Sequence, residues 1–427
     1  MAIVLCSEAQ PGMVLSADVK DRQGQVLITR GATLTEAHLR ALKIRGVNAI
    51  HVVDPTEEAS KKTVLSPEDM SQARQQVEAL FRLNAAHRGH PFIKTLHSQY
   101  LLRVTRHESG KSLAQPPETL AMNQFSRLAP DTEEADLDEP SLDHLVMRTQ
   151  TVASMPSIYH QLLEIVNDER SSAKDIARVI SADTGLTARL LRLVNSPFYG
   201  FPGKIETVSR AVAIVGVNEL CQLAMATTVI NTFNRALAGK MDIKGFWKHS
   251  LACAALCRAL ALRRREPNPE LHFVIGLLHD IGRLVLFTHM PQKTAAVWMK
   301  ELRGNEAAYR HEAAEWAFDH CDVGQALLNA WGLPDSLSEP VGNHHHPARN
   351  PSYPMETAVV HTANIIANVL YAAPVENPRE ACPTAPPFTP SAWDMLALSP
   401  DIVPQIMQEA ALQVKELSSV FELETGS

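Results

Sequence analysis

The chain has 427 residues, 45% of them apolar and 20% charged, so it can hold about two or three globular domains with a sizeable core. Its formal net charge of −7 gives no basic footprint, so no nucleic-acid partner is expected. The six cysteines include no CxxC pair and indicate no disulfide framework. The sequence shows no signal peptide and no run near the roughly 18 apolar residues of a membrane helix, so we expect a cytoplasmic protein without a membrane partner.

Residues 1–54 are predicted to form a small α/β module. Segments 14–19 and 25–29 are strand-like and are joined by a turn-rich tetrapeptide. A helix is expected from Thr35 to Arg45, with Gly46 suited to its C-terminal stop. Residues 48–53 alternate well enough to form a returning strand.

Residues 66–107 are predicted to form a helical connector, because Val77, Leu80 and Phe81 fall on one helix face. This face connects domains or forms a homodimer, and a solvated helix pair is the alternative. Residues 108–141 are an acidic, proline-containing linker, and a second Pro-rich stretch covers 374–390. Because few contacts cross such a linker, we expect 1–107 and 142–425 to be separable units.

The region 142–425 is predicted to be an all-helical bundle, since amphipathic stripes follow one another without an alternating strand series. Leu186, Leu190 and Val194 form one such stripe. Residues 172–175 resemble a helix-start capping box with Asp in place of the usual Glu. Proline at 197 disfavours helical geometry in the residue before it and should end a helix there.

A set of histidines with one His-Asp doublet lies in or beside these apolar segments. Its members are His249, His279-Asp280, His320 and His344-His345. A titratable group in an apolar run must be paired, hydrogen-bonded or bound to metal, and imidazoles with a carboxylate suit zinc, iron, manganese or nickel. On one helix, His279 and Asp280 would project about 100° apart and flank a common point. We therefore expect the set to converge in one bundle-core cavity, with separate core or surface histidines as the alternative.

Several motifs, in order, resemble the HDOD domains of bacterial signalling proteins, a branch of the HD superfamily of metal-dependent phosphohydrolases. The matching stretches are 186–196, 211–216, 246–250, 276–286, 320–328, 331–334 and 344–345. The resemblance spans roughly residues 142–425 and implies an all-helical HD-type domain there. Residues 11–15 and 31–35 resemble a small domain often found in front of HD-GYP signalling domains.

The resemblance also implies roles for the histidine set. His249, His279 and Asp280 match the first three metal ligands of HD enzymes. His320, His344 and His345 match the additional ligands of HD-GYP domains, which bind more than one metal. At the position of the later Asp this chain has Asn364, which can coordinate through oxygen but brings no charge. The implied cofactor is one or two divalent transition metal ions (iron, manganese, nickel or zinc), bound more weakly than by a full carboxylate set, or lost.

The HD-GYP hallmark loop is missing, because His346-Pro347 and the residues to 351 follow the histidine pair. Arg283 also stands where HD-GYP domains usually carry Lys. The resemblance therefore argues against cyclic di-GMP hydrolysis and leaves two functions open. The first is a signal-transduction module that binds partner signalling proteins under control of a metal or nucleotide. The second is a metal-dependent phosphohydrolase acting on a nucleotide or phosphodiester; an oxidative di-iron role is a third option. No catalytic residue is assigned.

Overall fold

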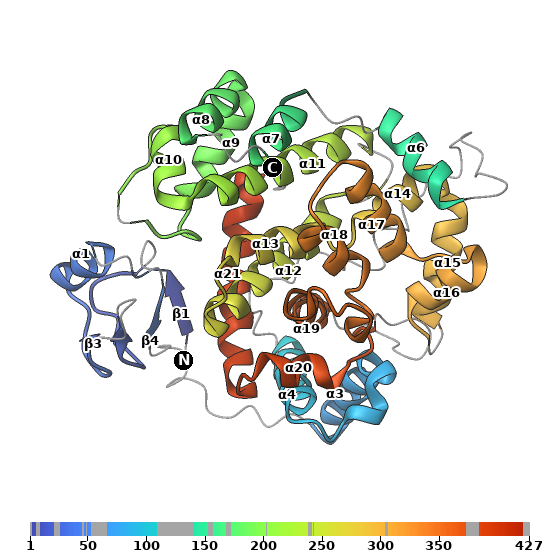
Figure 1. Ribbon diagram of the computed structural model, residues 1–427. Helices are drawn as coiled ribbons and strands as arrows, with labels where there is room; N and C mark the ends of the chain where they lie inside the picture. Colours follow the sequence, from blue (N-terminus) through green and yellow to red (C-terminus); the bar gives the residue numbers. More distant parts are fainter. Residues whose placement is uncertain are drawn as a thin grey trace.

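The computed structural model describes most of the chain and places a small module beside a large helical body (Figure 1). The described residues are 2–5, 9–20, 26–44, 47, 49–52, 66–108, 141–152, 157–167, 172–201, 203–237, 241, 243–303, 306–372 and 384–421. The acidic linker expected at 108–141 and the start of the Pro-rich stretch at 374–390 lie almost wholly outside these residues.

The α/β module expected at the start of the chain is present. Strand β1 (Ala2–Leu5) pairs antiparallel with β4 (Ala49–Val52), and β2 (Val19–Lys20) pairs with β3 (Val26–Ile28). Helix α1 (Glu36–Ile44) completes it. The module has an apolar cluster of its own, formed by Leu15, Val19, Ile28, Leu34, Leu42, Ile50 and Val52. The sequence prediction found β3, β4 and α1 but missed β1.

The rest of the described chain is helical, and from residue 66 onward its described part contains no strand. The α-helices are α3 (Pro67–Leu80), α4 (Pro91–Glu108), α6 (Leu142–Val152), α7 (Ser157–Asn167), α8 (Ala173–Ala182), α9 (Thr184–Val194), α10 (Val208–Val215), α11 (Val217–Ala236), α12 (Ile243–Arg264), α13 (Pro269–Leu278), α14 (Ile281–His289), α15 (Pro291–Arg303), α16 (Ala308–Trp316), α17 (His320–Ala330), α18 (Asp335–Gly342), α19 (Pro354–Tyr371), α20 (Pro390–Leu396) and α21 (Val403–Val420). Short 3₁₀ helices are η1 (Arg82–His87), η2 (Pro347–Arg349) and η3 (Pro400–Ile402).

Local signals in the sequence explain several helix ends. The Asp175 carboxylate accepts a hydrogen bond from the Ser172 backbone N–H, which forms the predicted capping box at the start of α8. Helix α9 buries Leu186, Leu190 and Val194 and ends at Val194, shortly before the proline, as predicted.

Helix α12 lies at the centre of the body and contacts α13, α19 and α21. Most of its residues are buried, as expected for a helix that is apolar on nearly all sides. A Cβ at Gly276 of α13 would lie 2.8 Å from Cα of Ala254 and from Sγ of Cys257. Glycine at this position therefore lets α13 lie close against α12, which fixes the end of α13 that leads into the His-Asp doublet.

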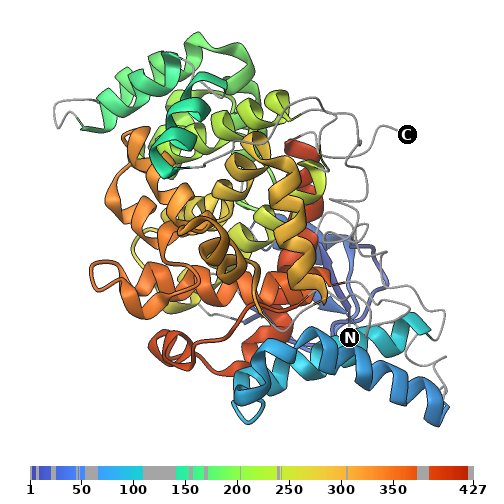
Figure 2. The same cartoon turned by 90° about the vertical axis from the view of Figure 1, so that its right-hand side faces the viewer.

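Helices α3 and α4 correct the predicted division of the chain. Their apolar residues belong to the same core cluster as the helices after residue 141, and the Phe92 ring stacks on Trp393 with centroids 4.3 Å apart. The face with Val77, Leu80 and Phe81 thus covers the helical body, along one side of which α3 and α4 lie (Figure 2). The expectation that 1–107 forms one separable unit is wrong for these helices.

A strap at residues 384–389 runs between these helices and the body. The Asn84 side-chain amide donates to the carbonyls of Ala385 and Pro386, and its oxygen accepts from the Phe388 N–H. At the far end of the strap, the Thr389 N–H donates to Nε2 of His361. Asn84 is fully buried, so these hydrogen bonds replace those it would make with water.

One helical stretch of the described chain, Pro269–His289, is long and apolar enough to cross a membrane, and 89% of its apolar window is buried inside the fold. A second candidate arises only if Val208–Val215 and Val217–Asn234, bent by 119°, count as one span. A buried core helix passes the same test of length and composition.

Candidate metal centre

The predicted ligands come from four places in the helical body. His249 lies in the N-terminal third of α12, and His320 is the first residue of α17. His344 and His345 directly follow α18. The doublet does not lie on one helix as predicted, because α13 ends at Leu278 and α14 begins at Ile281. Asp280 has φ −99° and ψ 11°, so the chain turns at the doublet itself.

Close packing of α14 on α17 explains this turn. A Cβ at Gly282 would collide with the carbonyl oxygen of His320. Only glycine allows the two helices to approach so closely, since any larger residue would push them apart. The turn at the doublet and this contact together bring the Asp280 carboxylate in front of the first residue of α17.

The Asp280 carboxylate is the point on which the histidines converge. Its Oδ1 lies 3.3 Å from Nε2 of His320 and 3.6 Å from Nε2 of His344. Its Oδ2 lies 3.4 Å from Nε2 of His279 and 3.8 Å from Nε2 of His249. The His345 ring lies 4.1 Å from that of His344, centroid to centroid. The structure thus brings all six residues together, as the sequence predicted.

In three of these histidine rings, Nδ1 already makes a hydrogen bond. Nδ1 of His279 lies 2.8 Å from the Gly276 carbonyl, and Nδ1 of His344 lies 2.7 Å from the Val341 carbonyl. A carbonyl can only accept, so both rings donate from Nδ1. His320 likewise donates from Nδ1 to the Glu312 carboxylate at 2.6 Å. Each Nε2 therefore faces Asp280 and, in the neutral ring, presents a lone pair there, the arrangement found in metal-ligating histidines.

Several atoms that face this point are buried and have no hydrogen-bond partner. They are Nε2 of His279, His320 and His345, together with Oδ1 of Asp280. Leaving buried acceptors unsatisfied costs about 1–3 kcal/mol each. Lone pairs of imidazole and carboxylate that converge in this way fit a divalent transition metal ion, which would satisfy them all.

Electrostatics at the site follow from burial and from Asp280. Burial lowers the pKa of His249 to about 3, and the neighbouring His279 adds to this effect. Burial also lowers the pKa of His279, but the Asp280 charge outweighs it and raises the pKa to about 10. Burial raises the pKa of Asp280, yet Arg283 and His279 together hold it well below its usual range. Without a metal, a proton on His279 thus balances the carboxylate, and metal binding would displace it.

Glu312 is a site residue that the sequence prediction missed. Its carboxylate accepts from the His320 ring, from the His320 backbone N–H at 2.9 Å and from Nε1 of Trp298 at 2.7 Å. It is fully buried on α16, whereas its neighbour Glu315 is exposed. Nothing in the local sequence separates these two acids, since only the packing of α16 on α17 distinguishes them.

A cavity of about 110 Å³ opens beside the centre. His249, Asp280, His345 and Asn364 line it on the side of the ligand set. Asn364 lies next to His249, and its side-chain oxygen accepts from Asn368 at 2.7 Å. The predicted seventh position is therefore at the site.

A cation and aromatic rings also line the cavity, and Nε of Arg283 lies 3.3 Å from Oδ1 of Asp280. Arg283 lines it and lies over the Trp298 ring, 5.6 Å from the centroid. Tyr309 stacks on His345, with ring centroids 4.6 Å apart. Thr384 and Pro386 of the strap form another part of the wall. The cavity thus offers a positive group and flat apolar surfaces next to the ligand set.

The body is all-helical, and its histidines surround the buried carboxylate of a His-Asp doublet. These two features together are those of an HD-type domain. Residues 152–347 match the family model of the HDOD domain, so this segment of the chain is an HDOD domain. The matched segment contains six of the seven predicted site residues and leaves out Asn364.

Solved structures share this fold. An HDOD domain protein with unknown function from Geobacter sulfurreducens is 20% identical, with a TM-score of 0.51 over 66% of this chain and 98% of that chain. A protein from Marinobacter aquaeolei VT8, provisionally named for signal transduction, is 18% identical, with a TM-score of 0.50 over 70% of this chain and 64% of that one.

A curated relative matches only in part. An uncharacterized protein of Treponema pallidum (strain Nichols) is 24% identical over 203 residues, which are 47% of this chain. The match spans 38% of that relative's length.

Proposed function

We propose that the HDOD domain binds one or two divalent transition metal ions and acts as a partner-binding module in signal transduction. The observation that carries the metal proposal is the convergence of histidine lone pairs on Asp280, each of three rings being held by its other nitrogen. The proposed ligands are His249, His279, Asp280, His320, His344 and His345. Asn364 is a weaker neutral ligand at the edge.

The contacts of the two Asp280 oxygens favour a site for two ions over a site for one. Oδ2 faces His249 and His279, whereas Oδ1 faces His320 and His344. One carboxylate between two imidazole groups is the arrangement in which a bridging ligand serves two adjacent ions. The chain's own residues would hold the ions and keep the site in the buried core of the body.

The regulatory assignment rests on what the site lacks for hydrolysis. Asn364 removes one anionic ligand, and the loop that follows the histidine pair in HD-GYP domains is replaced here by His346-Pro347 and its neighbours. Substrate-positioning groups supply much of an enzymatic rate, so their loss favours a binding role. The provisional name of the Marinobacter protein agrees with a role in signalling. The partner we expect is a cytoplasmic signalling protein.

The cavity supports a second candidate, a metal-dependent phosphohydrolase acting on a nucleotide or phosphodiester. Arg283 lies on the cavity wall, and the planar guanidinium matches phosphate oxygens. When bound, a metal at this site would supply Lewis-acid and water-activating chemistry.

Metal analysis with a substrate screen tests both candidates. The full chain is purified, its metal content is measured, and the metal-free protein is titrated calorimetrically with manganese, iron, nickel and zinc. Binding of at least one ion is expected, and binding of none would mean that the centre is vestigial. The loaded protein is then offered nucleotides and phosphodiesters, including cyclic di-GMP. Turnover near about 10 per second would replace the regulatory proposal by the enzymatic one.

A further inference from the structure

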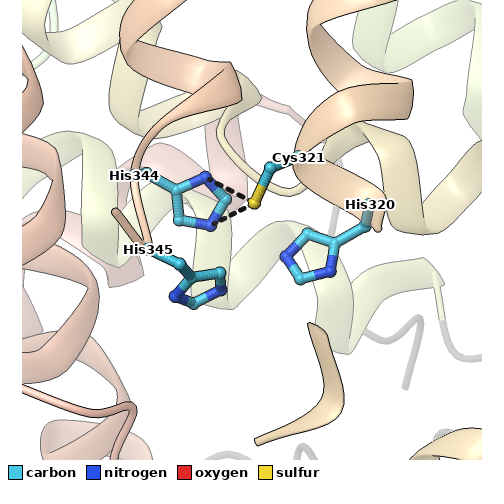
Figure 3. A group of neighbouring side chains, drawn as sticks. All are labelled: His320, Cys321, His344 and His345. Carbon is cyan, nitrogen blue, oxygen red and sulfur yellow. Dashed lines mark hydrogen bonds between the residues drawn. The ribbon is translucent and has the colours of Figure 1, made fainter. Parts of the chain in front are cut away.

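Cys321 is a buried thiol beside the histidine cluster that the resemblance to HD enzymes does not include among the ligands. It is 1% exposed and lies in the first turn of α17, directly after His320. Its Sγ lies 3.6 Å from Nδ1 and 3.9 Å from Nε2 of His344. Figure 3 shows Sγ pointing into the space between His344 and His345 on one side and His320 on the other.

The distances suit coordination of one ion. One candidate ligand atom from each of His320, Cys321, His344 and His345 can be chosen so that all four lie within 4.8 Å of one another. Tetrahedral zinc with bonds of about 2.0–2.3 Å separates its ligand atoms by about 3.3–3.8 Å. The four side chains would therefore move inward by up to about 1 Å to hold one ion.

Unsatisfied ring nitrogens point to a cation at this place. Nε2 of His320 and Nε2 of His345 are buried and have no hydrogen-bond partner, and Nδ1 of His320 already donates to Glu312, so the Nε2 of His320 is free to bind a cation. The Cys321 backbone N–H donates to the Asp319 carboxylate at 2.8 Å, which holds the residue at the N-terminus of α17.

We propose that the Cys321 thiolate is a metal ligand, together with His320, His344 and His345, and that it selects zinc, cobalt or iron over manganese and magnesium. Soft sulfur favours the former ions, whereas hard ions prefer oxygen ligands. The sulfur would also supply a negative charge on the side of Asp280 that faces His320 and His344. The inference rests on the proposed metal-binding function and adds the ligand that sets its selectivity.

Cobalt titration of the metal-free full chain tests the inference. Thiolate coordination gives a sulfur-to-cobalt charge-transfer band in the near-ultraviolet, and imidazole coordination alone gives only the weaker visible bands. We expect both in the natural protein and only the visible bands in Cys321→Ser and Cys321→Ala. Zinc affinity should fall by more than about 10-fold in these variants, because even loss of an outer-shell partner costs 10–100-fold. Manganese affinity should change less.

The matched control is Cys253→Ser, which alters another buried cysteine, on α12 near His279. Cys253→Ser should keep the near-ultraviolet band. Loss of the band in Cys253→Ser would identify Cys253 as the coordinating thiolate and overturn the inference. Visible bands without any charge-transfer band in the natural protein would also overturn it while leaving the proposed metal centre intact. Failure to bind cobalt and zinc at all would remove the metal centre itself. Circular dichroism of each variant confirms that it folds.

Discussion

His320 depends on Glu312 for its orientation, because that carboxylate holds both its ring and its backbone N–H. Glu312→Gln removes the charge that fixes the His320 tautomer, so we expect metal affinity to fall about 10–100-fold. Glu315→Gln is the matched control on the same helix, since Glu315 is exposed and pairs only with Lys300 among its described contacts. The test compares the metal Kd of Glu312→Gln with that of Glu315→Gln by calorimetry. Equal Kd values would show that Glu312 does not position a ligand.

Asp280 and Asn364 have opposite expected effects on metal content. Asp280→Ala removes the carboxylate that all four nearest imidazoles face, so binding should be abolished. Asn364→Asp adds an anionic oxygen beside His249 and should tighten binding. Metal bound per chain after dialysis measures both effects. Full occupancy in Asp280→Ala would exclude Asp280 as a central ligand.

At the scale of elements, the contact between α14 and α17 places the doublet. Gly282→Ala puts a Cβ against the His320 carbonyl, so we expect a loss of about 1–3 kcal/mol in the free energy of unfolding and weaker metal binding. Gly89→Ala is the control, because a Cβ there meets no atom within 4 Å. Denaturant unfolding and calorimetry of both variants test the prediction. A Gly282→Ala protein with unchanged stability and Kd would contradict it.

Sequence patterns predicted many of the elements and the convergence of the six site residues because those signals are local. The capping residues of α8, the stripe of α9 and six titratable groups in apolar runs can all be recognised within a few turns of chain. The turn at His279-Asp280 could not be predicted, because it depends on the contact of Gly282 with α17. The role of Glu312 and the packing of Phe92 on Trp393 likewise depend on residues far away in the sequence.

At the scale of the whole molecule, α3 and α4 share the apolar core of the helical body, and the front module has a separate apolar cluster. Deleting residues 1–54 should leave the Tm and metal content of the helical body nearly unchanged. Deleting 1–108 uncovers side chains that pack on Phe81 and Phe92, and each large apolar side chain contributes about 1.5–3 kcal/mol. Because domains are stable by only about 5–15 kcal/mol, that protein should lose cooperative unfolding. Thermal melts of the two truncated chains provide the test. Equal melting behaviour would restore the two-unit division.

The strap held by Asn84 has a consequence for the speed of ion exchange. Thr384 and Pro386 form part of the cavity wall, and Asn84 holds the carbonyl of Pro386. Asn84→Ala should loosen this wall without touching a ligand, so entry and escape of an ion should accelerate together. Stopped-flow loading and chelator-driven removal would then both become faster while the equilibrium Kd stays constant. A change in Kd, carried by only one of the two rates, would mean that residue 84 acts on the ligands and not on the passage to them.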